Sequence, residues 1–143
     1  MDILARRARR LQVMKALVFS GVVLVATGAA GDKLAGLSYA CFAGPGIDAA
    51  RAQDICAEVQ AVVRDLHAAP GLEVQTAPLA QGPGVEIEVI QASDTRLEVL
   101  PTLVDASGQR APQRSAGMFV VDTTMTATRR RAFFEKLLTA LPR

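Results

Sequence analysis

The sequence is poor in the residues from which catalytic and metal sites are usually built. It contains one histidine, two cysteines and no tryptophan, and its few aromatic residues are five Phe and one Tyr. It also lacks the Gly-x-Ser-x-Gly turn of many hydrolases and the lysine-terminated glycine loop that binds phosphate. We therefore predict no metal, no cofactor and no identifiable catalytic residue. With so few aromatics, a folded core must be built from Ala, Val and Leu.

Outside the N-terminus, the sequence also lacks a large excess of positive or negative charge. The formal net charge is +2, but five of the sixteen basic residues precede Ala16. From Gly31 onward there are eleven basic and thirteen acidic residues, a net charge of −2. A nearly neutral domain has no electrostatic reason to hold nucleic acid, so we predict no nucleic-acid partner. The excess of Arg over Lys and the abundance of Ala are typical of a GC-rich bacterial genome.

The N-terminus has the pattern of an export signal. A basic cluster is followed by residues 16–31, which carry no charge and end in small residues. This order is typical of a secretory signal peptide, with cleavage expected before Gly31. The alternative is an uncleaved inner-membrane anchor, although sixteen residues are fewer than the roughly 20 that a spanning helix needs. Both interpretations place the remaining chain in the periplasm or another extracytoplasmic space. The basic residues are Arg6, Arg7, Arg9, Arg10 and Lys15.

The hydrophobic pattern after the leader predicts a single α+β domain. Apolar residues recur with helical period between Ile47 and His67, and a second helix runs to about Leu141. Residues 85–90 are expected as a strand with one dry face, because apolar and acidic side chains alternate from Val85 to Val89. We expect a two-layer sandwich: a mostly antiparallel sheet of four to five strands, with two amphipathic helices on one face and an N-terminal hydrophobic helix before it. Residues 1–30 are the leader and residues 31–143 the exported domain. The expected strands are 37–43, 72–76, 85–90, 96–104 and 118–121.

The two cysteines are predicted to form a disulfide. Cys41 and Cys56 lie fifteen positions apart, one at the end of the first strand and one within the first helix. An even pair of cysteines in an exported protein is most simply a structural bridge. Two less favoured interpretations are a redox-active pair and two buried free thiols. The redox interpretation is weak because catalytic dithiols usually lie close together at a helix N-terminus.

His67 and the carboxylates of the alternating strand are the other titratable candidates. We interpret His67, the single histidine, as a surface residue at a helix end. Glu86 and Glu88 share a strand face, with Glu73 expected opposite them, and paired carboxylates can act as general acid and base. The alternation alone explains these residues as a solvated sheet face. We therefore assign them no catalytic role.

Arg129, Arg130 and Arg131 form the densest charge cluster of the domain. Consecutive helical residues are about 100° apart, so the three side chains cannot all point the same way. Cations are mildly unfavourable near a helix start, which makes the cluster a weak candidate for contact with an acidic partner or a lipid head group.

The first functional hypothesis is a non-enzymatic cell-envelope domain that binds or supports a macromolecular partner. The alternatives are a small periplasmic enzyme or thiol-redox accessory, and a carrier of a small apolar ligand.

Overall fold

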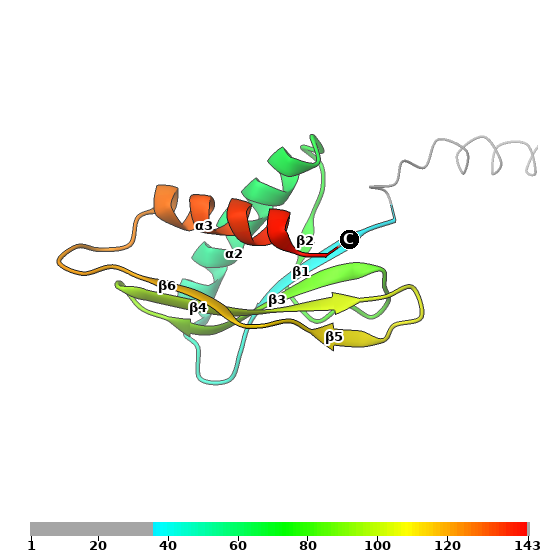
Figure 1. Ribbon diagram of the computed structural model, residues 1–143, viewed down its shortest axis with the longest axis horizontal. Helices are drawn as coiled ribbons and strands as arrows, with labels where there is room; N and C mark the ends of the chain where they lie inside the picture. Colours follow the sequence, from blue (N-terminus) through cyan, green and yellow to red (C-terminus); the bar gives the residue numbers. More distant parts are fainter. Residues whose placement is uncertain (1–35, 143) are drawn as a thin grey trace, which may run out of the picture. The chain divides into compact units, whose positions relative to one another are not determined.

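A computed structural model describes residues 36–142, which form one compact unit with its own core. The expected leader, its hydrophobic helix and the expected membrane contact through residues 16–31 lie outside the described residues. Six strands and two helices follow one another in the order β1, α2, β2, β3, β4, β5, β6 and α3 (Figure 1). Their bounds are Ser38–Ala43 for β1, Ala49–Leu66 for α2, Val74–Gln75 for β2, Gly84–Ala92 for β3, Arg96–Val104 for β4, Arg110–Pro112 for β5, Ala116–Phe119 for β6 and Ala127–Ala140 for α3.

The strands form one mixed sheet with the order β2-β1-β3-β4-β5, and β6 also pairs with β4. β1 runs parallel to both of its neighbours, β2 and β3, whereas β3, β4, β5 and β6 pair antiparallel. The prediction of an α+β fold is confirmed, but the prediction of a mostly antiparallel sheet of four to five strands is wrong, because the sheet is mixed and has six strands. The physical reason is α2: a helix between two neighbouring strands returns the chain to the end from which it started, so these strands must be parallel.

Helix α2 forms where the sequence predicted it. Asp48 is its N-cap and accepts a hydrogen bond from the backbone N–H of Arg51 at 3.0 Å. The apolar stripe of helical period faces the sheet, and Val59 and Val63 are fully buried. Leu66, which was expected on this stripe, is instead 46% exposed because it lies in the last turn before the C-cap His67.

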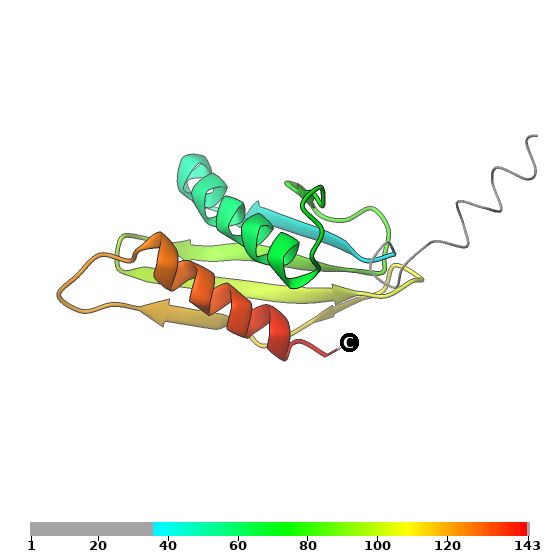
Figure 2. The ribbon, with the colours of Figure 1, turned by 90° about the horizontal axis from the view of Figure 1, so that it is seen from above.

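Both helices lie on the same face of the sheet, side by side (Figures 1 and 2). The main core lies between these two layers and is aliphatic, as expected, with one fully buried aromatic residue, Phe134 of α3. Thr126 caps α3 by accepting a hydrogen bond from the backbone N–H of Arg129 at 3.2 Å.

On the side of the sheet opposite β2, the outer strand that pairs with β4 is interrupted next to Pro101. Proline is usually confined to edge strands or bulges, but β4 lies inside the sheet and Pro101 is buried. The neighbouring strand is interrupted instead: β5 ends at Pro112, Gln113 donates its backbone N–H to the carbonyl of Pro101 at 2.8 Å, and β6 begins at Ala116. Because proline has no N–H to return that bond, pairing lapses here. Residues 105–117, which lie between the expected strands 96–104 and 118–121, thus contain β5 and the first two residues of β6.

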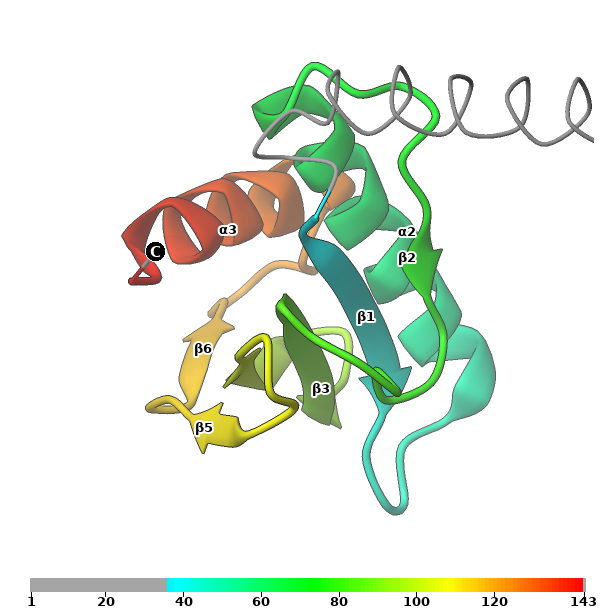
Figure 3. The ribbon, with the colours of Figure 1, turned by 90° about the vertical axis from the view of Figure 1, so that its right-hand side faces the viewer.

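The face of the sheet away from the helices is partly covered by residues 76–83, the segment between β2 and β3. Leu79 of this segment is 2% exposed and packs with Ala40 and Val104 in a second, smaller core cluster, against which Phe42 also packs. Figure 3 shows β2 beside β1 at the edge of the sheet, with the chain then crossing to β3. The solvated face that the sequence predicted is therefore limited to the end of the sheet that residues 76–83 do not cover.

Candidate functional site

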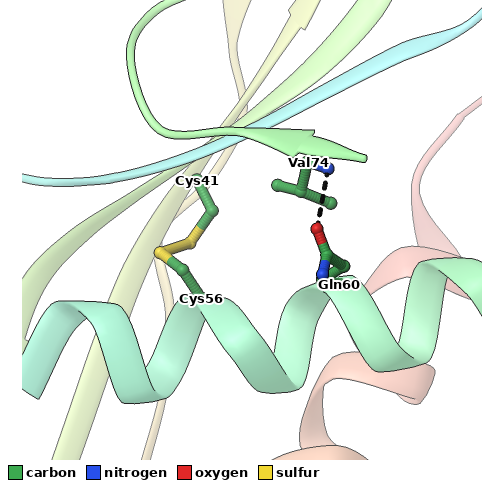
Figure 4. The surroundings of a disulfide bond; sticks show 4 residues. All are labelled: Cys41, Cys56, Gln60 and Val74. Atoms are coloured by element: carbon green, nitrogen blue, oxygen red, sulfur yellow. Dashed lines mark hydrogen bonds between the residues drawn. A yellow bond between two sulfur atoms is a disulfide. The ribbon is translucent and has the colours of Figure 1, made fainter. Parts of the chain in front are cut away.

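Cys41 and Cys56 are joined by a disulfide, as the sequence predicted. The bond links β1 to α2 with a Cα–Cα distance of 5.5 Å, and Cys41 is 1% exposed within the main core (Figure 4). One turn further along the helix, the side-chain oxygen of Gln60 accepts a hydrogen bond from the backbone N–H of Val74 at 3.2 Å. The same side of α2 is thus attached to both β1 and β2. The burial of Cys41 favours a structural bond over a redox-active one, because thiol exchange requires access to a sulfur atom.

The most developed polar cluster of the described chain joins Glu86 of β3, Arg110 of β5 and Leu79 of the covering segment. Arg110 donates from Nε to Glu86 Oε1 at 3.1 Å and from Nη2 to Glu86 Oε2 at 3.0 Å. Its Nη2 also donates to the carbonyl oxygen of Leu79 at 2.7 Å. The backbone N–H of Leu79 donates in turn to Glu86 Oε2 at 2.7 Å. Glu86 is 4% exposed. Because Leu79 is bonded through both its N–H and its C=O group, the cluster fixes residues 76–83 onto the sheet.

Burial and hydrogen bonding act in opposite directions on Glu86. Desolvation, the largest single influence, raises its pKa, but the hydrogen bonds from Arg110 and Leu79 and the attraction to Arg110 together hold the pKa below its ordinary value. The prediction that this carboxylate belongs to a solvated face is therefore wrong. Glu88 is half-buried, and Glu73 lies before β2, which pairs with β1 and not with β3. The structure does not assemble the three carboxylates.

His67 is half-buried and hydrogen-bonded through Nε2 to the hydroxyl of Tyr39 on β1. The two rings lie with their centroids 5.4 Å apart. The single histidine and the single tyrosine of the chain are thus partners, which connects the end of α2 to the start of the sheet. Sequence reasoning placed His67 at the helix end correctly, but no pattern signalled the contact with Tyr39, 28 residues away.

The three arginines of α3 diverge, as their spacing requires. Arg131 Nε donates to Glu58 Oε2 of α2 at 2.7 Å, so this residue holds the two helices together. Arg130 is half-buried and Arg129 is exposed. The sequence did not predict the ion pair with Glu58, which lies 73 residues earlier. Arg131 is thus structural, the Nε of Arg130 is buried without a hydrogen-bond partner among the described residues, and of the two remaining arginines only Arg129 is exposed.

Apolar side chains are exposed on β3 and around β6. Ile90 is 37% exposed, Phe119 of β6 is 72% exposed and Val121 is 68% exposed. Ile90 lies at the register shift between Val89 and Gln91 of β3, whereas Phe119 lies opposite Arg96 of β4 and Val121 follows β6. We call Ile90, Phe119 and Val121 the exposed apolar surface. The sequence predicted a strand over residues 118–121 but not its exposure, because a short apolar run does not show which of its faces is covered.

Few other features of the described residues resemble a ligand site. Within residues 36–142 there is no group of three or more His, Cys, Asp or Glu placed to hold a metal ion. A shallow, open depression lies along α3 beside Glu135, Lys136 and Thr139. None of the described helices is long and apolar enough to cross a membrane. Comparison with protein-family models, with curated proteins and with solved structures finds no match to this chain.

Proposed function

We propose that this protein is a non-enzymatic cell-envelope domain, located in the periplasm, that binds or supports a macromolecular partner. The observation that carries the proposal is the exposed apolar surface. Two of its three side chains are more than two-thirds exposed, well above Leu66, the other exposed large apolar residue of the described chain, at 46%. Contiguous exposed apolar patches are typical of contact sites for other macromolecules, and Phe119 and Val121 lie two residues apart at the end of β6 and just after it.

The disulfide supports the compartment. Bonds of this kind persist in oxidising spaces and are rare in the cytosol. Together with the basic and apolar N-terminal pattern, the Cys41–Cys56 bond favours export of the domain. N-terminal sequencing of the protein isolated from its host tests this: a mature chain that begins near Gly31 supports export, and an intact Met1 on soluble cytosolic protein contradicts it.

Site-specific photo-crosslinking tests the partner. A photoreactive amino acid at Ile90, in the full chain expressed in its host, is expected to give a discrete adduct with a different macromolecule. The matched control is the same amino acid at Gln53, an exposed position of α2. Equal labelling at both positions, or no adduct at Ile90, would refute the proposed contact surface.

A further inference from the structure

The middle of the segment that covers one end of the sheet is held by a single residue. We call residues 77–81 the strap. Four of its five residues are exposed and make no hydrogen bond within the described chain. The fifth, Leu79, is 2% exposed; its N–H donates to Glu86 Oε2 and its C=O accepts from Arg110 Nη2, both at 2.7 Å. Segments with so few buried contacts are the least stable parts of a fold.

The chain on either side of the strap is attached to the sheet independently of Leu79. Before the strap, Gln75 of β2 pairs with Ala40 of β1. After it, the carbonyl of Pro83 accepts a hydrogen bond from the backbone N–H of Ser38 at 3.0 Å. The strap can therefore leave the sheet at Leu79 while the residues that flank it stay in place.

The side chain of Leu79 packs on the second core cluster, against Ala40 and Val104. The glycine at position 84 leaves room for it, since a Cβ on Gly84 would lie 2.5 Å from Leu79 Cδ1 and equally close to the carbonyl oxygen of Ser38. Glycine inside a strand often marks a place where other atoms approach the backbone closely. Movement of the strap would therefore remove one fitted side chain and uncover the second core cluster.

The charged pair beneath the strap keeps its own bonds when the strap is absent. Arg110 donates to both carboxylate oxygens of Glu86, at 3.1 and 3.0 Å. The Arg110 side chain is 45% exposed, so water can replace the carbonyl of Leu79 as its additional partner. Opening of the strap thus leaves no buried charge without a partner, a situation that would strongly oppose it.

We propose that the strap opens as a unit while the rest of the domain stays folded, and that it acts as a lid over the second core cluster. When the strap is closed it hides Ala40 and Val104, and when it is open it exposes them on the sheet face away from the helices. The open state is expected to be a minor population of the native protein. The inference does not involve the exposed apolar surface, so it does not rest on the proposed function.

Hydrogen exchange of the wild-type full chain, followed by NMR, tests the proposal without any substitution. If the strap opens by itself, the amide of Leu79 should be protected at least about tenfold less than the most protected amides of β3, which lies between β1 and β4. A smaller difference would mean that Leu79 is released only when the whole domain unfolds, and it would overturn the proposal.

Two matched leucine substitutions provide a second readout. Leu79→Asp places a charge beside Glu86 and should hold the strap open, so that the amides of residues 77–81 exchange without protection. The protection of β3 should fall by no more than the factor by which the Leu79 amide is protected in the wild type, because closure contributes only that much. Leu97→Asp is the control: Leu97 is similarly buried, at 1% exposed, but lies in the main core, so this variant should unfold.

The two variants distinguish a lid from an integral part of the core. A Leu79→Asp variant that unfolds as Leu97→Asp does would show that the strap cannot leave without the rest of the domain. Retained protection of residues 77–81 in a folded Leu79→Asp variant would show that Leu79 is not what holds the strap. Either result would refute the proposal.

Discussion

Removing the link between Cys41 and Cys56 should destabilise the domain by an amount that follows from its loop length. The two residues are fifteen positions apart, so the chain-entropy model predicts a loss of about 3 kcal/mol in the free energy of unfolding. The described domain spans residues 36–142, and at the usual unfolding entropy per residue this loss lowers Tm by about 13 °C. Urea denaturation and calorimetry of the Cys41→Ala/Cys56→Ala variant measure both quantities.

The single variants separate loss of the crosslink from loss of packing. If the crosslink dominates, Cys41→Ala and Cys56→Ala each cost about as much as the double variant, because either one breaks the bond. Cys41 is 1% exposed, so its replacement should cost somewhat more than that of Cys56, which is only half-buried. A reducing agent should lower the Tm of the wild type and leave that of the double variant unchanged. Costs of the single variants that add up to that of the double variant, or a double variant within about 1 kcal/mol of the wild type, would refute the reasoning.

Three further perturbations test other parts of the structure. Because the pKa of Glu86 lies below its ordinary value of 4.5, the stability this carboxylate contributes is present above that pH and is lost as the pH falls through the lowered pKa. Urea midpoints measured across this acidic range should thus fall less steeply for Glu86→Gln than for wild type, and Arg110→Ala should lower the midpoint at pH 7; parallel pH curves would contradict this. Phe134→Ala, at a fully buried position, should cost about 3–5 kcal/mol by the same denaturation assay, and a loss below about 1 kcal/mol would show that α3 does not pack as described. Thr126→Ala removes the cap of α3 and should cost about 1 kcal/mol, whereas Thr126→Ser should be nearly neutral.

Local periodicity predicted most of the elements. Residues such as Ile55 and Val59 recur at helical spacing, and Val85, Ile87 and Val89 alternate as in a strand, so α2 and β3 could be located before any pairing was known. The disulfide followed from the even number of cysteines and the export pattern. These features depend on residues that lie close together in the sequence, so the sequence alone is enough to predict them.

Pairing partners could not be predicted in the same way. Nothing near Leu37 or Leu72 indicates that β1 runs parallel to both β2 and β3, since direction depends on how α2 crosses the sheet. The burial of Glu86 likewise depends on Arg110, 24 residues later, and on a loop that covers one end of the sheet. Alternation showed that Glu86 faces away from the helices, but it carried no information on what covers that face.

The parallel pairing of β1 and β3 has a consequence for the order in which the protein assembles. Ser38 pairs with Gly84, 46 residues further along, whereas β3, β4 and β5 follow one another as a local antiparallel meander. Strands that meet across a long intervening chain lose more entropy on closing, so they tend to meet late. During folding β1 must wait for β3, and the disulfide to Cys56 and the hydrogen bond between Tyr39 and His67 can hold it against α2 in the meantime. The protein is thus expected to assemble as two halves, β1 with α2 and the meander with α3, that join last along the β1–β3 junction.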